Sequence, residues 1–364
     1  MWNIKHCARL YNDRVDSVIK KDCEMGLFHK SSDISLMCKE MLACMQFYFR
    51  GIYYAEIIED DRDTGVYFQE FDSDNDLYTE KEKENQFLNF SEGWHTIVIN
   101  KTEIKEFRER VRSTVRNDKL YEHPAFEAYR EEKNELERIL FQYGLMFIFY
   151  HEYGHVADGH KLAEYHGKIE ITNSLQRALE YSADMFAVNQ TCYHMISDYM
   201  IFGKYGKADE DKVQAILDEF PLMLLGAYIF LDGLYRREEM TNDDFRNRIL
   251  ADDTHIAPFI RQHYIFEQFA GIWTNPKYSG YNNLNIDRLN YEALHCLDAY
   301  ERAVYNAGIS EAPFVYAEGA MGMSVISQAQ QCWNEYYEKL QEFVSPGAGI
   351  GRYDVLNVAK KGYE

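Results

Sequence analysis

The sequence from Tyr150 to Ala157, Tyr-His-Glu-Tyr-Gly-His-Val-Ala, places two histidines four positions apart and contains one acidic residue, Glu152. Residues four apart on an α-helix lie one turn apart on the same face, so His151 and His155 would point in the same direction. The other positions are uncharged, whereas a helix on the protein surface would carry charges there. The segment therefore predicts a buried helix that presents two imidazoles on one side.

Two imidazoles at this spacing can each offer a nitrogen to one metal ion. Glu152 projects beside them, where its carboxylate can accept a proton from a water molecule that the metal activates. These residue types predict metal-dependent hydrolysis, with His151 and His155 as metal ligands and Glu152 as the general base. The alternative is a pair of core histidines that are satisfied by hydrogen bonds on an amphipathic helix.

A catalytic zinc site usually has three protein ligands and keeps its fourth position for water, so a third ligand is expected elsewhere. The helix-forming stretch from Arg177 to Ala187 places Glu180 and Asp184 four apart on one face. Glu180 could bind the metal, while Asp184 could accept the other N–H of a ligand histidine and fix its tautomer. The alternative is that Glu180 is a solvated helix carboxylate and that Asp184 pairs with Arg177 on the surface.

Together, His-Glu-x-x-His at 151–155 and Glu-x-x-Ala-Asp-x-Phe-Ala at 180–187 resemble the two motifs of the gluzincins, a class of zinc metallopeptidases. Within that class the sequence is similar to the repressor-cleaving ImmA/IrrE type, to the Lit-like phage-exclusion type and to the CAAX-prenyl-endopeptidase group. The resemblance covers residues 147–188. It implies Zn²⁺ as the cofactor and a bacterial or prophage regulatory endopeptidase that cuts one intracellular protein.

A further segment, from Thr254 to Arg261, resembles the Ser/Thr-His-Pro…Arg segment of the CAAX-endopeptidase group. The spacing of six positions between His255 and Arg261 is retained, although Ile256 and Ala257 separate the histidine from the proline. The resemblance implies that His255 or Arg261 stabilises the oxyanion as the tetrahedral intermediate forms.

His160 follows His155 by five positions, which invites comparison with the metzincin pattern His-Glu-x-x-His-x-x-Gly-x-x-His. That pattern needs a glycine at position 158 and a histidine at position 161, where this chain has Asp158 and Lys161. We therefore expect Gly159 to end the helix and His160 not to be a metal ligand.

The formal net charge of −21 argues against nucleic acid and anionic membranes as partners, because both would repel the chain. A basic segment of a protein or peptide substrate would instead be attracted. Residues 1–6 lack the apolar core of a signal peptide, and no apolar run approaches the length that spans a bilayer. The seven cysteines include no Cys-x-x-Cys pair, which predicts reduced thiols. These features predict a cytoplasmic protein and leave its oligomeric state open.

The periodicity of the apolar residues predicts a small sheet followed by long helices. Strands are predicted at 52–58, 65–71 and 94–99, and helices at 103–117, 124–159, 173–197, 209–237, 284–306 and 318–343. The predicted fold is α+β, predominantly helical and zincin-like, with a small N-terminal sheet over the active-site helix. Residues 65–71 or 94–99 could form the sheet edge that pairs with an extended peptide substrate.

The predicted organisation is an N-terminal α/β portion at 1–105 and a helical metallopeptidase portion at 106–364, which could form one continuous domain. The preferred function is that of a zinc-dependent endopeptidase. The alternative is a non-catalytic, zinc-stabilised helical module that binds another protein, although such a site has no need of Glu152 as a base and usually closes its fourth position. Hydrolysis of a bond other than a peptide is a third hypothesis, because activated water is a general nucleophile.

Overall fold

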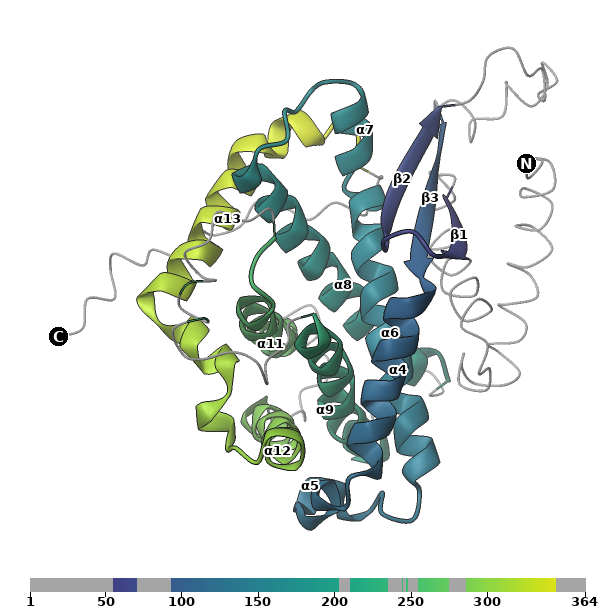
Figure 1. The fold of residues 1–364 in the computed structure, drawn as a ribbon, viewed down its shortest axis with the longest axis vertical. Coiled ribbons are helices and arrows are strands. Elements are labelled where there is room, and N and C mark those ends of the chain that lie inside the picture. The colour runs from purple at the N-terminus through teal and green to yellow at the C-terminus, as the bar shows by residue number, and fades with distance from the viewer. Residues whose placement is uncertain are drawn as a thin grey trace. The chain divides into compact units, whose positions relative to one another are not determined.

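The computed structural model of the protein describes residues 55–70, 93–202, 210–234, 244, 247, 255–274 and 286–344. This part of the chain is mostly helical and contains a small sheet (Figure 1), which confirms the predicted α+β, predominantly helical fold class. The chain divides into two units. The first comprises residues 1–102, 152–170 and 338–351, and the second comprises residues 103–151, 171–337 and 352–364.

The sheet of the first unit has three strands in the order β1-β3-β2, namely β1 (Ala55–Asp60), β2 (Gly65–Glu70) and β3 (Gly93–Asn100). β3 runs parallel to β1 and antiparallel to β2, so that Ile97 lies between Ile57 and Val66. Because β3 is the central strand of the described sheet, residues 94–99, one of the two alternatives for a substrate-binding edge, do not form an edge. The other predicted candidate, β2, lies at an edge of the described sheet.

Nine α-helices are described after the sheet, together with short 3₁₀ segments. They are α4 (Lys101–Arg116), α5 (Pro124–Glu127), α6 (Lys133–Ala157), α7 (His160–Tyr165), α8 (Asn173–Phe202), α9 (Glu210–Gly233), α11 (Pro258–Thr274), α12 (Ile286–Tyr305) and α13 (Ala320–Leu340). The single helix predicted at 124–159 is divided into α5 and α6. Between them the chain turns, and Nη2 of Arg130 donates to the main-chain oxygen of Tyr121 at 2.7 Å, which ties this turn to the preceding 3₁₀ segment.

α6 is buried on every side from Leu140 to its last residue, Ala157, because each residue of this stretch is buried. Apart from Glu152 and the two histidines, the side chains in this stretch carry no ionisable group other than the phenols of tyrosine. Burial of this kind removes a large apolar area from water without leaving unpaired charges. The predicted buried helix around the histidine motif is confirmed.

α6 and α9 approach each other closely at two glycines of the second unit. A Cβ atom on Gly144 would lie 2.8 Å from the main-chain oxygen of Gly226, and one on Gly226 would lie 2.7 Å from the main-chain oxygen of Leu140. No side chain fits at such distances, so the crossing requires glycine at both positions. It fixes α6 against α9 about two turns before His151.

α9 lies within the helix predicted at 209–237, and its residues from 220 to 229 are buried. None of the helices in the described ranges combines the length and the apolarity that a membrane crossing needs.

Gly159 separates α6 from α7 in the first unit. Its φ angle is 69°, in the left-handed region that favours glycine, and a Cβ atom there would lie 2.4 Å from the main-chain oxygen of Phe343. Both the backbone angle and the space require glycine. The prediction that Gly159 ends the histidine-bearing helix is confirmed, and His160 becomes the first residue of α7.

α11 is a helix that the sequence analysis did not predict. It begins at Pro258, whose missing N–H costs nothing in a first helical turn. Six apolar or aromatic residues at helical spacing are buried along it, namely Phe259, Ile260, Tyr264, Ile265, Phe269 and Ile272. α11 is in contact with α8, α9 and α12 (Figure 1), and the ring of Phe269 meets that of Phe220 on α9.

Candidate metal centre

α6 carries the three residues of the His-Glu-x-x-His motif. His151, Glu152 and His155 are all buried, with 7%, 8% and 7% of their surface exposed. The division between the two units falls within α6, after His151. Because α6 is one continuous helix, His155 follows His151 by one turn, and both rings lie on one face.

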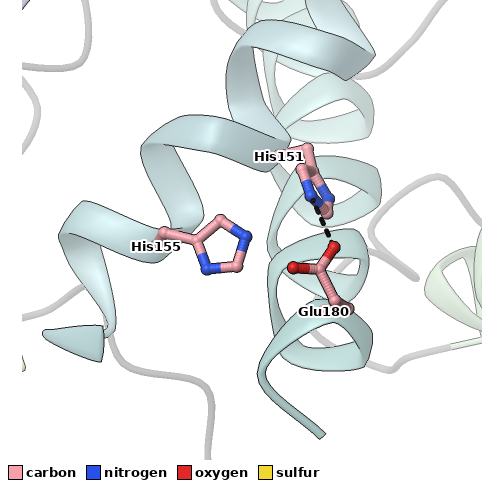
Figure 2. Close-up of side chains that lie close together, drawn as sticks. All are labelled: His151, His155 and Glu180. Carbon is pink, nitrogen blue, oxygen red and sulfur yellow. Dashed lines mark ion pairs between the residues drawn. The ribbon is translucent and has the colours of Figure 1, made fainter. Parts of the chain in front are cut away.

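α8 brings a carboxylate to these imidazoles. Oε2 of Glu180 lies 3.2 Å from Nε2 of His151. His151, His155 and Glu180 each offer one nitrogen or oxygen atom, and these three atoms lie within 4.8 Å of one another. In Figure 2 the ring of His155 points toward the space beside Glu180, one helical turn from His151. This buried group could hold a metal ion.

His151 is held between two carboxylates. Its Nδ1 lies 2.8 Å from Oδ1 of Asp184, while its Nε2 faces Glu180. Burial alone would lower the pKa of His151, but the carboxylates of Asp184 and Glu180 outweigh it and raise the pKa. With Nδ1 bonded to Asp184, Nε2 is the atom directed at Glu180, which is the arrangement that a metal-binding histidine needs.

Asp184 is fully buried and is surrounded by donors from α11. Arg261 donates from Nε to Oδ2 at 2.8 Å and from Nη2 to Oδ1 at 2.7 Å, and the hydroxyl of Tyr264 donates to Oδ2. Burial alone would raise the pKa of Asp184, but Arg261 and His151 outweigh it and lower the pKa. The carboxylate is therefore held ionised, as an acceptor for His151.

Arg261 therefore has a different neighbour from the one that the sequence suggested. The resemblance implied that either His255 or Arg261 lies at the oxyanion. In the structure Nε and Nη2 of Arg261 both donate to Asp184, on the Nδ1 side of His151. The other oxyanion candidate, His255, is on the exposed side: its side chain is 59% exposed and its Nε2 lies 4.0 Å from Oε1 of Glu180. The same Oε1 accepts a hydrogen bond from Nε2 of Gln176 at 2.9 Å.

His155 has a hydrogen-bond partner on α7. Nδ1 of His160 lies 2.8 Å from Nδ1 of His155, and the two rings meet edge to face. His160 is itself buried, and its Nε2 lies 3.9 Å from Asp158. In the structure His160 contacts His155 and is not one of the three residues of the His151, His155 and Glu180 group.

Sequence reasoning missed three contacts of the site: those of Gln176 with Glu180, of Tyr264 with Asp184 and of His160 with His155. Gln176 precedes Glu180 by one helical turn, so its spacing was a usable signal. Tyr264 follows Arg261 by three positions, which becomes a signal only once 258–274 is recognised as a helix.

The donor set suits zinc. Two imidazole nitrogens and one carboxylate oxygen form the ligand set of many catalytic zinc sites, and such sites bond the remaining N–H of a ligand histidine to a carboxylate. His151, His155, Glu180 and Asp184 match this pattern in residue type and in hydrogen bonding. The residues present therefore fit a zinc ion.

Comparison with known proteins gives one family match. Residues 47–198 match the model of the family Peptidase U49, a segment that includes α6 and most of α8 and thus both helices of the candidate centre. Searches among curated proteins and among solved structures give no match. The similarity of this segment to a peptidase family supports a proteolytic function for the chain.

Proposed function

We propose that this protein is a zinc-dependent endopeptidase. The observation that carries the proposal is the buried group of His151, His155 and Glu180, which two helices bring within 4.8 Å, with Glu152 next to the first ligand. The match of residues 47–198 to a peptidase family independently supports peptide-bond cleavage. In this proposal His151, His155 and Glu180 hold the metal.

Glu152 is the proposed general base. When bound, zinc supplies a Lewis acid that polarises the scissile carbonyl and makes water a nucleophile near neutral pH. Glu152 takes the proton from the attacking water and delivers it to the leaving amine, so that its carboxylate is regenerated. Its burial places this carboxylate in a low dielectric, where its electrostatic interactions are less screened by bulk water.

His255 is the proposed oxyanion donor. Its side chain is exposed, and it lies beside Glu180 at the solvent side of the group, where a substrate carbonyl would enter. A donor in this position would stabilise the negative charge that develops on the carbonyl oxygen. Arg261 is not assigned this role, because its Nε and Nη2 both donate to Asp184.

The proposed substrate is an extended segment of an intracellular protein. β2 lies at an edge of the described sheet, and such an edge can pair with an extended peptide through main-chain hydrogen bonds. The net charge of −21 favours a basic segment over nucleic acid or an anionic membrane. The cysteine pattern supports a cytoplasmic location.

The experiment that tests the proposal replaces Glu152 with Gln. The variant should keep about one zinc ion per chain, measured by elemental analysis, and should lose hydrolysis by about 10²–10⁴-fold. Glu137→Gln is a matched control, because Glu137 lies on the same helix and pairs with Arg112 away from the metal centre. Wild-type activity in Glu152→Gln would remove Glu152 from the mechanism.

The substrate for this test comes from a cell lysate. Digestion of a whole cytosolic extract, followed by sequencing of new protein termini, distinguishes a single-target enzyme from a broad protease. A wild-type protein that binds zinc and releases no new termini would instead be a zinc-stabilised binding module. Turnover of small esters or amides without peptides would indicate another hydrolase.

A further inference from the structure

Arg261 and Tyr264 lie three positions apart on one face of α11, and both donate to the same buried carboxylate. Each oxygen of Asp184 receives two contacts. Oδ1 meets Nδ1 of His151 and Nη2 of Arg261, while Oδ2 meets Nε of Arg261 and the hydroxyl of Tyr264. The carboxylate is therefore surrounded by donors from two helices.

This arrangement fixes the orientation of Asp184. A buried carboxylate is costly unless it is paired and hydrogen-bonded, and the side chains of Asp184 and Arg261 are 0% and 8% exposed. The planar guanidinium bonds both oxygens in parallel, which sets the plane of the carboxylate as well as its position. The direction in which Oδ1 meets His151 thus depends on α11 as much as on α8.

The support extends beyond α11. The ring of Tyr264 packs against the ring of Tyr181 with centroids 4.8 Å apart, and Nε2 of Gln330 on α13 donates to the hydroxyl of Tyr181 at 2.9 Å. All of these residues are buried. A side chain held in this way has little freedom to rotate, so the hydrogen bond to His151 is pre-organised.

We propose that Arg261 and Tyr264 are positioning residues, which hold Asp184 so that His151 presents Nε2 to the metal. This inference rests on the proposed function, because it concerns the affinity of the same centre for zinc. The residues of α11 do not touch the substrate in this scheme. Their effect is carried through Asp184 and His151 to the metal, and it is measured as zinc affinity.

The test uses Arg261→Lys and Tyr264→Phe in the full chain. Lysine keeps the positive charge and loses the planar fork, while phenylalanine keeps the ring and loses one donor. Arg112→Lys is the matched control, because Arg112 pairs with Glu137 of α6 outside the centre. Each metal-free protein is titrated with Zn²⁺ against a chromophoric chelator, the absorption spectrum of the Co²⁺ form is recorded, and circular dichroism verifies folding.

We expect the Kd for Zn²⁺ to rise by about 10–100-fold in Arg261→Lys, and by about 10-fold in Tyr264→Phe. The Co²⁺ spectrum should change in both, and Arg112→Lys should match the wild type. Unchanged zinc affinity and Co²⁺ spectra in folded variants would overturn the proposal, as would a loss of kcat alone in Arg261→Lys, which would place Arg261 at the substrate.

If Arg261→Lys does not fold, Tyr264→Phe decides the matter, because it removes only one hydroxyl. A wild-type protein that binds no zinc would contradict the proposed function itself. If the wild type binds zinc and both variants bind it with the same affinity, only the positioning role of Arg261 and Tyr264 is contradicted.

Discussion

Two fully buried aspartates of the second unit, Asp184 and Asp232, both accept hydrogen bonds from tyrosine hydroxyls, but the other residues around them differ. Asp184 accepts from Arg261, Tyr264 and His151. Asp232 accepts from the hydroxyls of Tyr300, at 2.6 Å, and Tyr305, while the partly exposed Arg110 remains 4.0 Å away. One aspartate has a histidine of the candidate metal centre among its partners, whereas the contacts around the other join α4, α9 and α12.

The comparison shows that burial and tyrosine hydrogen bonds do not by themselves indicate function. Around Asp232 they connect α9 to α12, and the hydroxyl of Tyr228 on α9 adds a third such bond, to the buried Glu301 at 2.7 Å. Around Asp184 the same chemistry is directed at a histidine whose other nitrogen faces a carboxylate. The difference lies in what the carboxylate holds in place, and it can be tested by changing one aspartate at a time.

The largest effect is expected for Asp184→Asn. The change leaves the charge of Arg261 buried without its counter-ion and weakens the bond to His151, so the free energy of unfolding should fall by about 3–5 kcal/mol. The Kd for zinc should rise by about 10–100-fold in the fraction that folds. Chelator competition and urea unfolding measure the two effects. Wild-type zinc affinity in Asp184→Asn would show that Asp184, like Asp232, has no effect on metal binding.

Removal of the metal should have the next largest effect. A ligand that binds only the folded state stabilises it by about 2.7 kcal/mol at a concentration of 100 times its Kd. The metal-free protein should therefore unfold at a lower temperature than the zinc-loaded one. The difference should shrink in Asp184→Asn and should persist in Asp232→Asn. Scanning calorimetry with and without a chelator checks this, and equal shifts in both variants would contradict the comparison.

Asp232→Asn should lower stability alone. Asparagine keeps one carbonyl oxygen as an acceptor, and Arg110 can turn toward water, so the free energy of unfolding should fall by about 1–3 kcal/mol. The zinc Kd of the folded protein should stay at the wild-type value. A combined Asp184→Asn and Asp232→Asn protein should show additive losses, since the two aspartates share none of the partners named above. A raised zinc Kd in Asp232→Asn would show that the two regions are coupled.

The local part of the candidate metal centre could be predicted from the sequence. Helical spacing alone placed His151 and His155 on one face of α6, with Glu152 beside them. The same spacing placed Glu180 and Asp184 on one face of α8. The buried character of α6 followed from its lack of charge. The fold class followed in the same way, from long helical stretches after a few short strands.

The contacts between distant segments could not be predicted. Arg261 reaches Asp184 across 77 positions, and no local spacing encodes that pairing. The central place of β3 likewise depends on how strands pair in space and not on the alternation within each strand. The tyrosines around Asp232 are 68 and 73 positions away along the chain, and single aromatic residues carry no signal of a buried acceptor.

Tyr300→Phe should have a smaller effect than either aspartate change. It removes one of the hydroxyl donors to Asp232 and leaves that of Tyr305, so the free energy of unfolding should fall by about 1 kcal/mol. Zinc affinity should not change. Tyr264→Phe removes an equivalent hydroxyl from Asp184, and its comparable loss of stability should come with weaker zinc binding. Parallel urea unfolding and chelator competition on the two variants measure the difference.

The smallest effect is expected at a third aspartate, Asp298 on α12, which is only partly buried. Burial alone would raise its pKa, but hydrogen bonds from Arg302 at 2.6 Å and from the main-chain N–H of Ile309 at 2.8 Å outweigh burial and lower the pKa. A lowered folded-state pKa contributes stability that is present above the unfolded-state pKa near about 4 and is lost as the pH falls through the folded-state value.

Asp298→Asn should therefore remove part of the acid sensitivity of the fold. Between about pH 5 and pH 3, the free energy of unfolding should fall less steeply in the variant than in the wild type, with a difference below about 1 kcal/mol. Urea unfolding at stepped pH measures both slopes. Because Asp298 has no contact with the centre among those described above, zinc affinity at neutral pH should be unchanged. Identical slopes would show that Arg302 and Ile309 do not stabilise the charged form of Asp298.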